Sequence, residues 1–158
     1  MTSSAYDASS AEKLELAASR ILRGARRLIS SLGYSSVCEL ALPNGRRADI
    51  AAISASGQIL IFEIKSSVAD FRADHKWREY RDYCDKLYFA VAPDGPIGLI
   101  PEDTGLIVAD SYSGELVRDA PATNLPPARR RAMLLIFARH AADRLHMLQD
   151  PQQSAHLR

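Results

Sequence analysis

Residues 47–67 of the chain read RADIAAISASGQILIFEIKSS. Two runs rich in apolar and β-branched residues flank the dipeptide Ser56-Gly57, which is typical of a tight turn. The pattern predicts two antiparallel strands, over residues 48–54 and 58–66. A hydrophobic β-hairpin is therefore expected here.

Three charged residues interrupt this apolar hairpin: Asp49, Glu63 and Lys65. Strand side chains alternate between faces, so Glu63 and Lys65 project from the same face, roughly 6–7 Å apart along the strand. A turn at Ser56-Gly57 places Asp49 opposite residue 64. A shift of one residue then brings Asp49 beside Glu63 or Lys65.

A further acid, Glu39, lies on a strand predicted over residues 34–42. The turn residues Pro43-Asn44-Gly45 set Glu39 roughly opposite Asp49. Three carboxylates and Lys65 should thus converge at one end of the sheet. Neighbouring carboxylates repel each other unless a cation lies between them. A hard divalent ion with oxygen ligands, Mg²⁺ or Mn²⁺, suits such a set.

This arrangement favours hydrolysis of phosphodiester bonds. A metal held by Glu39, Asp49 and Glu63 can lower the pKa of a bound water and polarise a phosphoryl oxygen. Lys65 can orient that water or stabilise charge in the transition state. The catalytic residues predicted on this basis are Asp49, Glu63 and Lys65.

The rest of the chain predicts alternating helices and strands. Apolar residues recur every three or four positions from Ala11 to Leu32, which indicates an amphipathic helix that ends at Gly33. A strand that follows a crossover helix should pair in parallel with the hairpin's second strand or near it. The later elements are expected to be a helix over residues 68–84 and a strand over residues 86–92. Two short strands, over residues 106–109 and 115–117, and a helix over residues 128–148 should follow.

These elements predict an α/β fold, with a mixed sheet of about five strands flanked by helices. Residues 11–150 form one domain in this interpretation. Residues 1–10 are small and polar, and they are expected to be a disordered N-terminus. Residues 151–158 are expected to be a disordered tail.

Composition indicates a soluble protein. The chain has 158 residues, of which 47% are hydrophobic and 25% charged. Its net charge of +1 predicts that any DNA binding would need a local basic patch. The sequence has neither a signal-peptide pattern nor an apolar run of roughly 18–20 residues. We therefore expect a cytoplasmic protein with no membrane partner.

The spacing of the charged residues resembles that of the PD-(D/E)XK nuclease superfamily. Asp49 is followed, after thirteen residues, by Glu63-Ile64-Lys65 on a strand, and then by a helix and a strand. The superfamily's two metal-binding acids correspond to Asp49 and Glu63, and its lysine corresponds to Lys65. Its additional acid corresponds to Glu39, whereas Ala48 stands where the superfamily often has proline. The resemblance implies a restriction-endonuclease-like sheet with an αβββαβ core.

Residues 46–92, with the runs ADIAAI and FEIKSS, are also similar to the MmcB-like family of bacterial DNA-repair proteins. This closer resemblance covers residues 20–110. Together the two resemblances imply a Mg²⁺- or Mn²⁺-dependent deoxyribonuclease acting in DNA repair or recombination. The alternative is a non-catalytic DNA-binding or protein-docking module of a repair complex that keeps the nuclease fold. A homodimer is a further option, because it is common in the superfamily.

Substrate contacts are expected from four residues. Arg46 and Arg47 precede the first acid of the hairpin and would steer DNA, as would the arginines of the first or last helix. The superfamily resemblance implies that Lys76 and Tyr80, on the predicted helix 68–84, contact the substrate. The simpler alternative is that Tyr80 packs on the sheet while Lys76 is solvated.

Structural alternatives exist for the charged residues as well. Glu63 and Lys65 could form an ordinary ion pair at the sheet margin, and such pairs contribute roughly 0–1 kcal/mol when exposed. Asp49 could pair with an arginine just before it. Glu39 could occupy an ordinary solvent-facing strand position.

Overall fold

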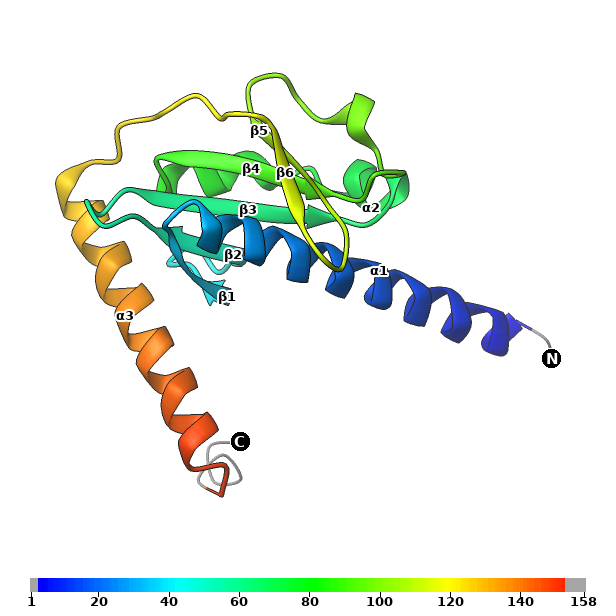
Figure 1. The fold of residues 1–158 in the computed structure, drawn as a ribbon, viewed down its shortest axis with the longest axis horizontal. Coiled ribbons are helices and arrows are strands. Elements are labelled where there is room, and N and C mark those ends of the chain that lie inside the picture. The colour runs from blue at the N-terminus through cyan, green and yellow to red at the C-terminus, as the bar shows by residue number, and fades with distance from the viewer. Residues whose placement is uncertain (1–2, 153–158) are drawn as a thin grey trace.

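A six-stranded mixed sheet lies at the centre of the protein, with its strands in sequence order (Figure 1). The computed structural model describes residues 3–152. The elements are α1 (Ser3–Ser31), β1 (Ser35–Ala41), β2 (Arg47–Ile53), β3 (Ile59–Lys65), α2 (Val68–Ala73), the 3₁₀ helix η1 (Trp77–Tyr83), β4 (Lys86–Val91), the 3₁₀ helix η2 (Ile97–Leu99), β5 (Gly105–Ala109), β6 (Gly114–Arg118) and α3 (Pro127–Gln149).

The strand directions confirm the predicted order of elements. β1, β2 and β3 form an antiparallel meander, β3–β4 and β4–β5 are parallel, and β6 returns antiparallel to β5. The sheet has six strands against about five expected, because both short strands expected over 106–109 and 115–117 join it as the β5–β6 hairpin, with an irregular register between Leu106 and Ile107. The predicted mixed sheet flanked by helices is confirmed.

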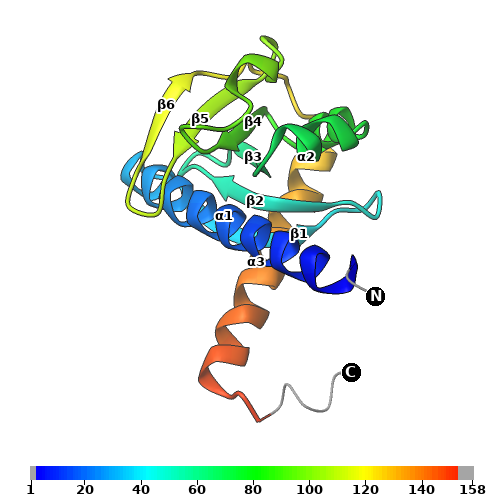
Figure 2. The same cartoon turned by 90° about the vertical axis from the view of Figure 1, so that its right-hand side faces the viewer.

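Helices cover both faces of the sheet (Figure 2). On one face α1 packs over a buried cluster that includes Ile21, Ala25, Ile29, Ile50, Ala52, Leu60 and Phe62. On the other face η1 and α3 pack over a cluster that includes Ala51, Ile59, Ile61, Trp77, Phe89, Met133 and Phe137. β3 lies between β2 and β4 and is buried along almost its whole length. Any charge on its side chains is therefore costly to place.

The hairpin register differs from the prediction by one residue. Ile53 pairs with Ile59 and Ile50 pairs with Phe62, so the register places Asp49 opposite position 63 rather than 64. The turn is centred on residue 56 and uses the left-handed backbone of Gly57, whose φ is 85°. This register puts Asp49 directly beside Glu63.

The N-terminal helix is longer than expected. It begins at Ser3, so the expectation of disorder was wrong for residues 3–10, while residues 1–2 lie outside the described part of the chain. The segment holds neither glycine nor proline, and extending an existing helix avoids the cost of nucleation. The predicted disordered tail at 151–158 lies outside the described residues from 153 onward.

The helix predicted over residues 68–84 is interrupted. Ser67 caps α2 by accepting a hydrogen bond from the Asp70 N–H at 3.0 Å, and α2 ends at Ala73. Asp74 then leaves the helical conformation, and its carboxylate accepts a hydrogen bond from the Lys76 N–H. The chain continues as the 3₁₀ helix η1, which turns Trp77 into the core.

Within the described residues, the helices are too short or too polar to cross a membrane.

A partly buried ion pair links the sheet to the start of α3. Asp85 is 5% exposed and accepts two hydrogen bonds from the Arg130 guanidinium, at 2.6 and 2.7 Å. Its Oδ2 atom also accepts one from the Ile59 N–H at 2.7 Å. Asp85 thus ties β3 to α3.

Asp85→Ala should lower the free energy of unfolding by about 3 kcal/mol, because it leaves a guanidinium and a buried N–H without their partner. Urea denaturation measures this change. Asp94→Ala, at an exposed loop position, is the matched control and should stay within about 0.5 kcal/mol of the wild type. Equal effects of the two substitutions would contradict this assignment.

Candidate active site

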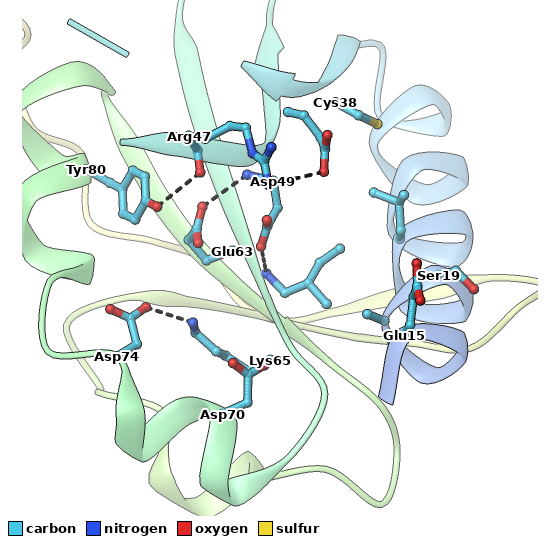
Figure 3. Close-up of a pocket in the computed structure, with 14 residues that line it drawn as sticks. Glu15, Ser19, Cys38, Arg47, Asp49, Glu63, Lys65, Asp70, Asp74 and Tyr80 are labelled. Carbon is cyan, nitrogen blue, oxygen red and sulfur yellow. Dashed lines mark hydrogen bonds and ion pairs between the residues drawn. The ribbon is translucent and has the colours of Figure 1, made fainter. Parts of the chain in front are cut away.

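A hollow of about 630 Å³ opens where β3 ends, between α1, β1, β2 and the α2–η1 segment (Figure 3). Six of the eight predicted site residues line this hollow: Glu39, Arg47, Asp49, Glu63, Lys65 and Tyr80. The sequence did not single out three further acids on its wall: Glu15, Asp70 and Asp74. The sheet thus brings the predicted acids and the lysine together.

Asp49 and Glu63 lie side by side and bond to each other's strand. The Asp49 N–H donates to Glu63 Oε1 at 3.2 Å, and the Ile64 N–H donates to Asp49 Oδ2 at 2.8 Å (Figure 3). The regular pairing of β2 with β3 ends one residue earlier, at Ile50 and Phe62. The two carboxylates therefore satisfy backbone donors where the strands separate.

Burial makes this carboxylate pair reluctant to ionise. Glu63 is 4% exposed, and burial together with the nearby charge of Asp49 raises its pKa to about 9. Burial also raises the pKa of Asp49, although the hydrogen bond from Ile64 opposes the shift. In the absence of a bound cation, the pair should hold a proton at neutral pH.

Lys65 is buried and ionised beside the two acids. It is 6% exposed, and its Nζ atom lies 2.7 Å from Asp74 Oδ2. Burial alone would lower the pKa of Lys65, but the hydrogen bond and charge of Asp74 outweigh burial and raise it. The same contact outweighs burial at Asp74 and lowers the pKa of its carboxyl. Lys65 thus pairs with an acid other than its predicted neighbour Glu63.

Glu39 lies opposite Asp49, as predicted, but on distorted backbone. Its neighbours Cys38 and Leu40 pair with β2, whereas Glu39 itself has a φ of 56°. A left-handed conformation is uncommon for glutamate and costs of order 1–3 kcal/mol. The exposed side chain lies with Oε1 3.7 Å from Arg47 Nη2. Glu39 is thus at the rim of the hollow, held by an arginine.

Two predicted substrate contacts lie elsewhere. Arg46 pairs with Glu79 at 2.9 Å, and neither it nor Lys76 lines the hollow. Lys76 is exposed, as the simpler alternative had it. Tyr80 packs in the core and also reaches the hollow, where its hydroxyl donates to the Arg47 carbonyl at 3.1 Å.

The donor set fits a hydrated divalent ion better than a fully enclosed one. Among residues 3–152, no three His, Cys, Asp or Glu side chains are already gathered around one point suited to a metal. Mg²⁺ commonly binds through one or two carboxylates and keeps several waters. Asp49 and Glu63 supply such a pair, and Glu39 could join it on release from Arg47.

Comparison with known proteins identifies the family. The family described as "DNA repair protein MmcB-like" matches residues 5–152. A solved structure described as "SPO1766 protein of unknown function from Silicibacter pomeroyi" is similar at 42% sequence identity, with a TM-score of 0.83. The match covers 85% of this chain and 92% of that one. No curated protein matches the sequence. The chain belongs to the MmcB-like family.

Proposed function

We propose that the protein is a metal-dependent nuclease that hydrolyses DNA phosphodiester bonds in DNA repair or recombination. The observation that carries this proposal is the contact of the half-buried Asp49 with the buried Glu63, beside the ionised Lys65. The description of the family supports a role in DNA repair. The order of the strands agrees with the nuclease resemblance drawn from the sequence.

A divalent cation would explain why a half-buried and a buried acid lie side by side. Their pKa values are raised because each ionised carboxylate is desolvated and repels the other. Binding of Mg²⁺ or Mn²⁺ to Asp49 and Glu63 would offset both effects and favour the ionised form. A metal bound there supplies a water of lowered pKa and polarises a phosphoryl oxygen.

The chain's own cations suit the remaining tasks. Asp74 holds Lys65 beside the acids, where its ammonium group can orient a water or stabilise developing negative charge. Arg47 lies at the rim with its side chain 65% exposed, and its guanidinium can bind a phosphate through two parallel hydrogen bonds. Asp74 is thus a positioning residue for Lys65 in this proposal.

A non-catalytic DNA-binding module remains the second candidate function. Asp49 and Glu63 bond to backbone N–H groups, so both already have a structural role. A cleavage assay separates the two candidates, because a binding module retains DNA without cutting it.

Purified protein should cleave plasmid, single-stranded or branched DNA with Mg²⁺ or Mn²⁺ and not with EDTA. Asp49→Asn and Lys65→Met should each reduce the cleavage rate by at least about 100-fold, because each removes a charge at the reacting centre. Glu102→Gln, an exposed substitution in the loop before β5, should cleave at the wild-type rate. Binding without cleavage of every substrate would rule out the nuclease, and equal rates in all variants would point to a contaminant.

Stability should fall as pH rises, because of Glu63. Its pKa is about 9 in the folded protein against an ordinary value of 4.5, so the folded state holds the extra proton between those values. This stabilisation is fully present below about pH 4.5 and is lost progressively up to about pH 9, by at most ~1.4 kcal/mol per pH unit. Urea denaturation in EDTA at several pH values should show a flatter pH dependence for Glu63→Gln. Parallel curves would contradict the raised pKa.

Divalent ions should stabilise the wild type most at alkaline pH. A metal binds the deprotonated carboxylates, and it need not displace a proton once Glu63 has ionised. Mn²⁺ should therefore raise the melting temperature more at pH 9 than at pH 6, and should have little effect on Glu63→Gln. An equal increase in that variant would place the ion elsewhere.

A further inference from the structure

Three neighbouring hollows lie along β1, and each shares lining residues with the next. The acidic hollow shares Cys38 with a middle hollow of about 360 Å³. The middle hollow shares Arg26 and Ser36 with a distal hollow of about 450 Å³. Both α1 and α3 contact β1 and then extend away from the sheet in different directions (Figures 1 and 2). We call the middle and distal hollows together the β1 groove.

Cys38 lines both the acidic and the middle hollow, and charges from both sides act on its thiol. Burial raises the pKa of its thiol, and the charges of Arg26 and Arg144 oppose that shift. The charges of Glu39 and Asp49, on the acidic side, raise the pKa further. Cys38 is thus within reach of both the acids and the arginines.

The β1 groove concentrates positive charge in a chain of low net charge. Its lining contains four exposed arginines, Arg23, Arg26, Arg27 and Arg144. Among the described residues that line either hollow, none is an aspartate or a glutamate. The whole chain carries a net charge of only +1, so this patch is a local feature. Such a row of guanidinium groups suits a polyanion.

The middle hollow also has apolar walls. Val37 of β1 and Leu145 and Leu148 of α3 line it beside the arginines. Leu145 is 55% exposed and Leu148 is 80% exposed, because this end of α3 extends beyond the sheet (Figure 1). The groove therefore offers apolar surface and positive charge along the same path.

We propose that the β1 groove binds a single strand of DNA and leads it into the acidic hollow. The arginines contact the phosphates, while unpaired bases pack against Val37, Leu145 and Leu148. Single-stranded DNA exposes base faces as well as phosphates, whereas a duplex keeps its bases stacked inside. This inference rests on the proposed function, because it names the form of the substrate and the route to the site.

Two of the arginines are already oriented by the fold. Arg26 donates to Ser36 at 3.2 and 3.3 Å, and Arg27 donates to the Tyr112 carbonyl at 2.9 Å. Each guanidinium has further N–H groups for a phosphate. Arg23 and Arg144 are exposed, so replacing them should cost little stability and they serve best as test positions.

The test is fluorescence anisotropy with a labelled oligothymidylate of about 12 nucleotides, in EDTA, over a range of KCl concentrations. The double variant R23Q/R144Q should bind at least about 10-fold more weakly at low salt. The slope of log affinity against log salt should fall by about 1.4, which is the value for two lost phosphate contacts on a single strand. Leu148→Gln should weaken binding several-fold without changing that slope.

The matched control is R131Q/R139Q, which removes the same charge from exposed positions of α3. The sequence grouped these two arginines with Arg144 as expected DNA contacts, but in the structure they line neither hollow of the groove. This control should bind within about 2-fold of the wild type. Wild-type affinity in R23Q/R144Q, an equal loss in the control, or equal affinity for a duplex of the same length would each overturn the proposal.

Binding in EDTA separates this proposal from the nuclease proposal. Groove-dependent binding by a protein that never cleaves DNA would support the groove and overturn the nuclease. Metal-dependent cleavage with unchanged rate and affinity in R23Q/R144Q would support the nuclease and overturn the groove. Asp49→Asn should retain groove binding, because Asp49 lies outside the arginine row.

Discussion

The contact between Asp49 and Glu63 is the constraint on which the site depends. β2 and β3 pair regularly up to Ile50 and Phe62. Beyond that point, the carboxylates of the two acids accept hydrogen bonds from backbone N–H groups. The half-buried Asp49 and the buried Glu63 are thereby fixed side by side, where both resist ionisation. Pairs of titratable groups whose pKa values are displaced in this way are frequent at functional sites.

The surrounding charges are arranged around that pair. Asp74 compensates the charge of Lys65, so the lysine remains ionised in a buried position without neutralising the two acids. Glu39 and Arg47 occupy the rim, where a third acid and a cation are accessible to solvent. Arg26 of α1 and Arg144 of α3 line the middle hollow, which shares Cys38 with the acidic hollow. The acidic hollow and the arginines proposed to bind phosphates are thus adjacent but separate.

Much of this arrangement could be predicted from local sequence patterns. The alternation of strand residues and the Ser56-Gly57 turn predicted Asp49 opposite residue 64, beside Glu63 or Lys65 after a shift of one residue, and the structure has it beside Glu63. The lysine's partner could not be found in this way, because Asp74 was assigned to a continuous helix. The helix stops at Ala73, and Asp74 contacts Lys65 across the fold. The only signal in the sequence was that Asp74 follows Asp70 by four residues in the segment that comes directly after β3.

Other features depend on distant parts of the chain. Arg46 was predicted to steer DNA, yet it pairs with Glu79, thirty-three residues later, and does not line the hollow. The left-handed backbone at residue 39 could not be predicted, because the residue there is a glutamate and not a glycine. The β1 groove joins residues of α1, β1 and α3, which hydrophobic periodicity alone cannot bring together.

Calorimetric titration of Mn²⁺ at pH 7.5, in two buffers with different ionisation enthalpies, measures ion binding and proton release together. If the buried acids form a metal site, Mn²⁺ binds and releases about one proton, because Glu63 is protonated below a pKa of about 9. Asp49→Asn should abolish that binding. Absence of binding, binding without proton release, or unchanged binding in Asp49→Asn would contradict a metal site at Asp49 and Glu63.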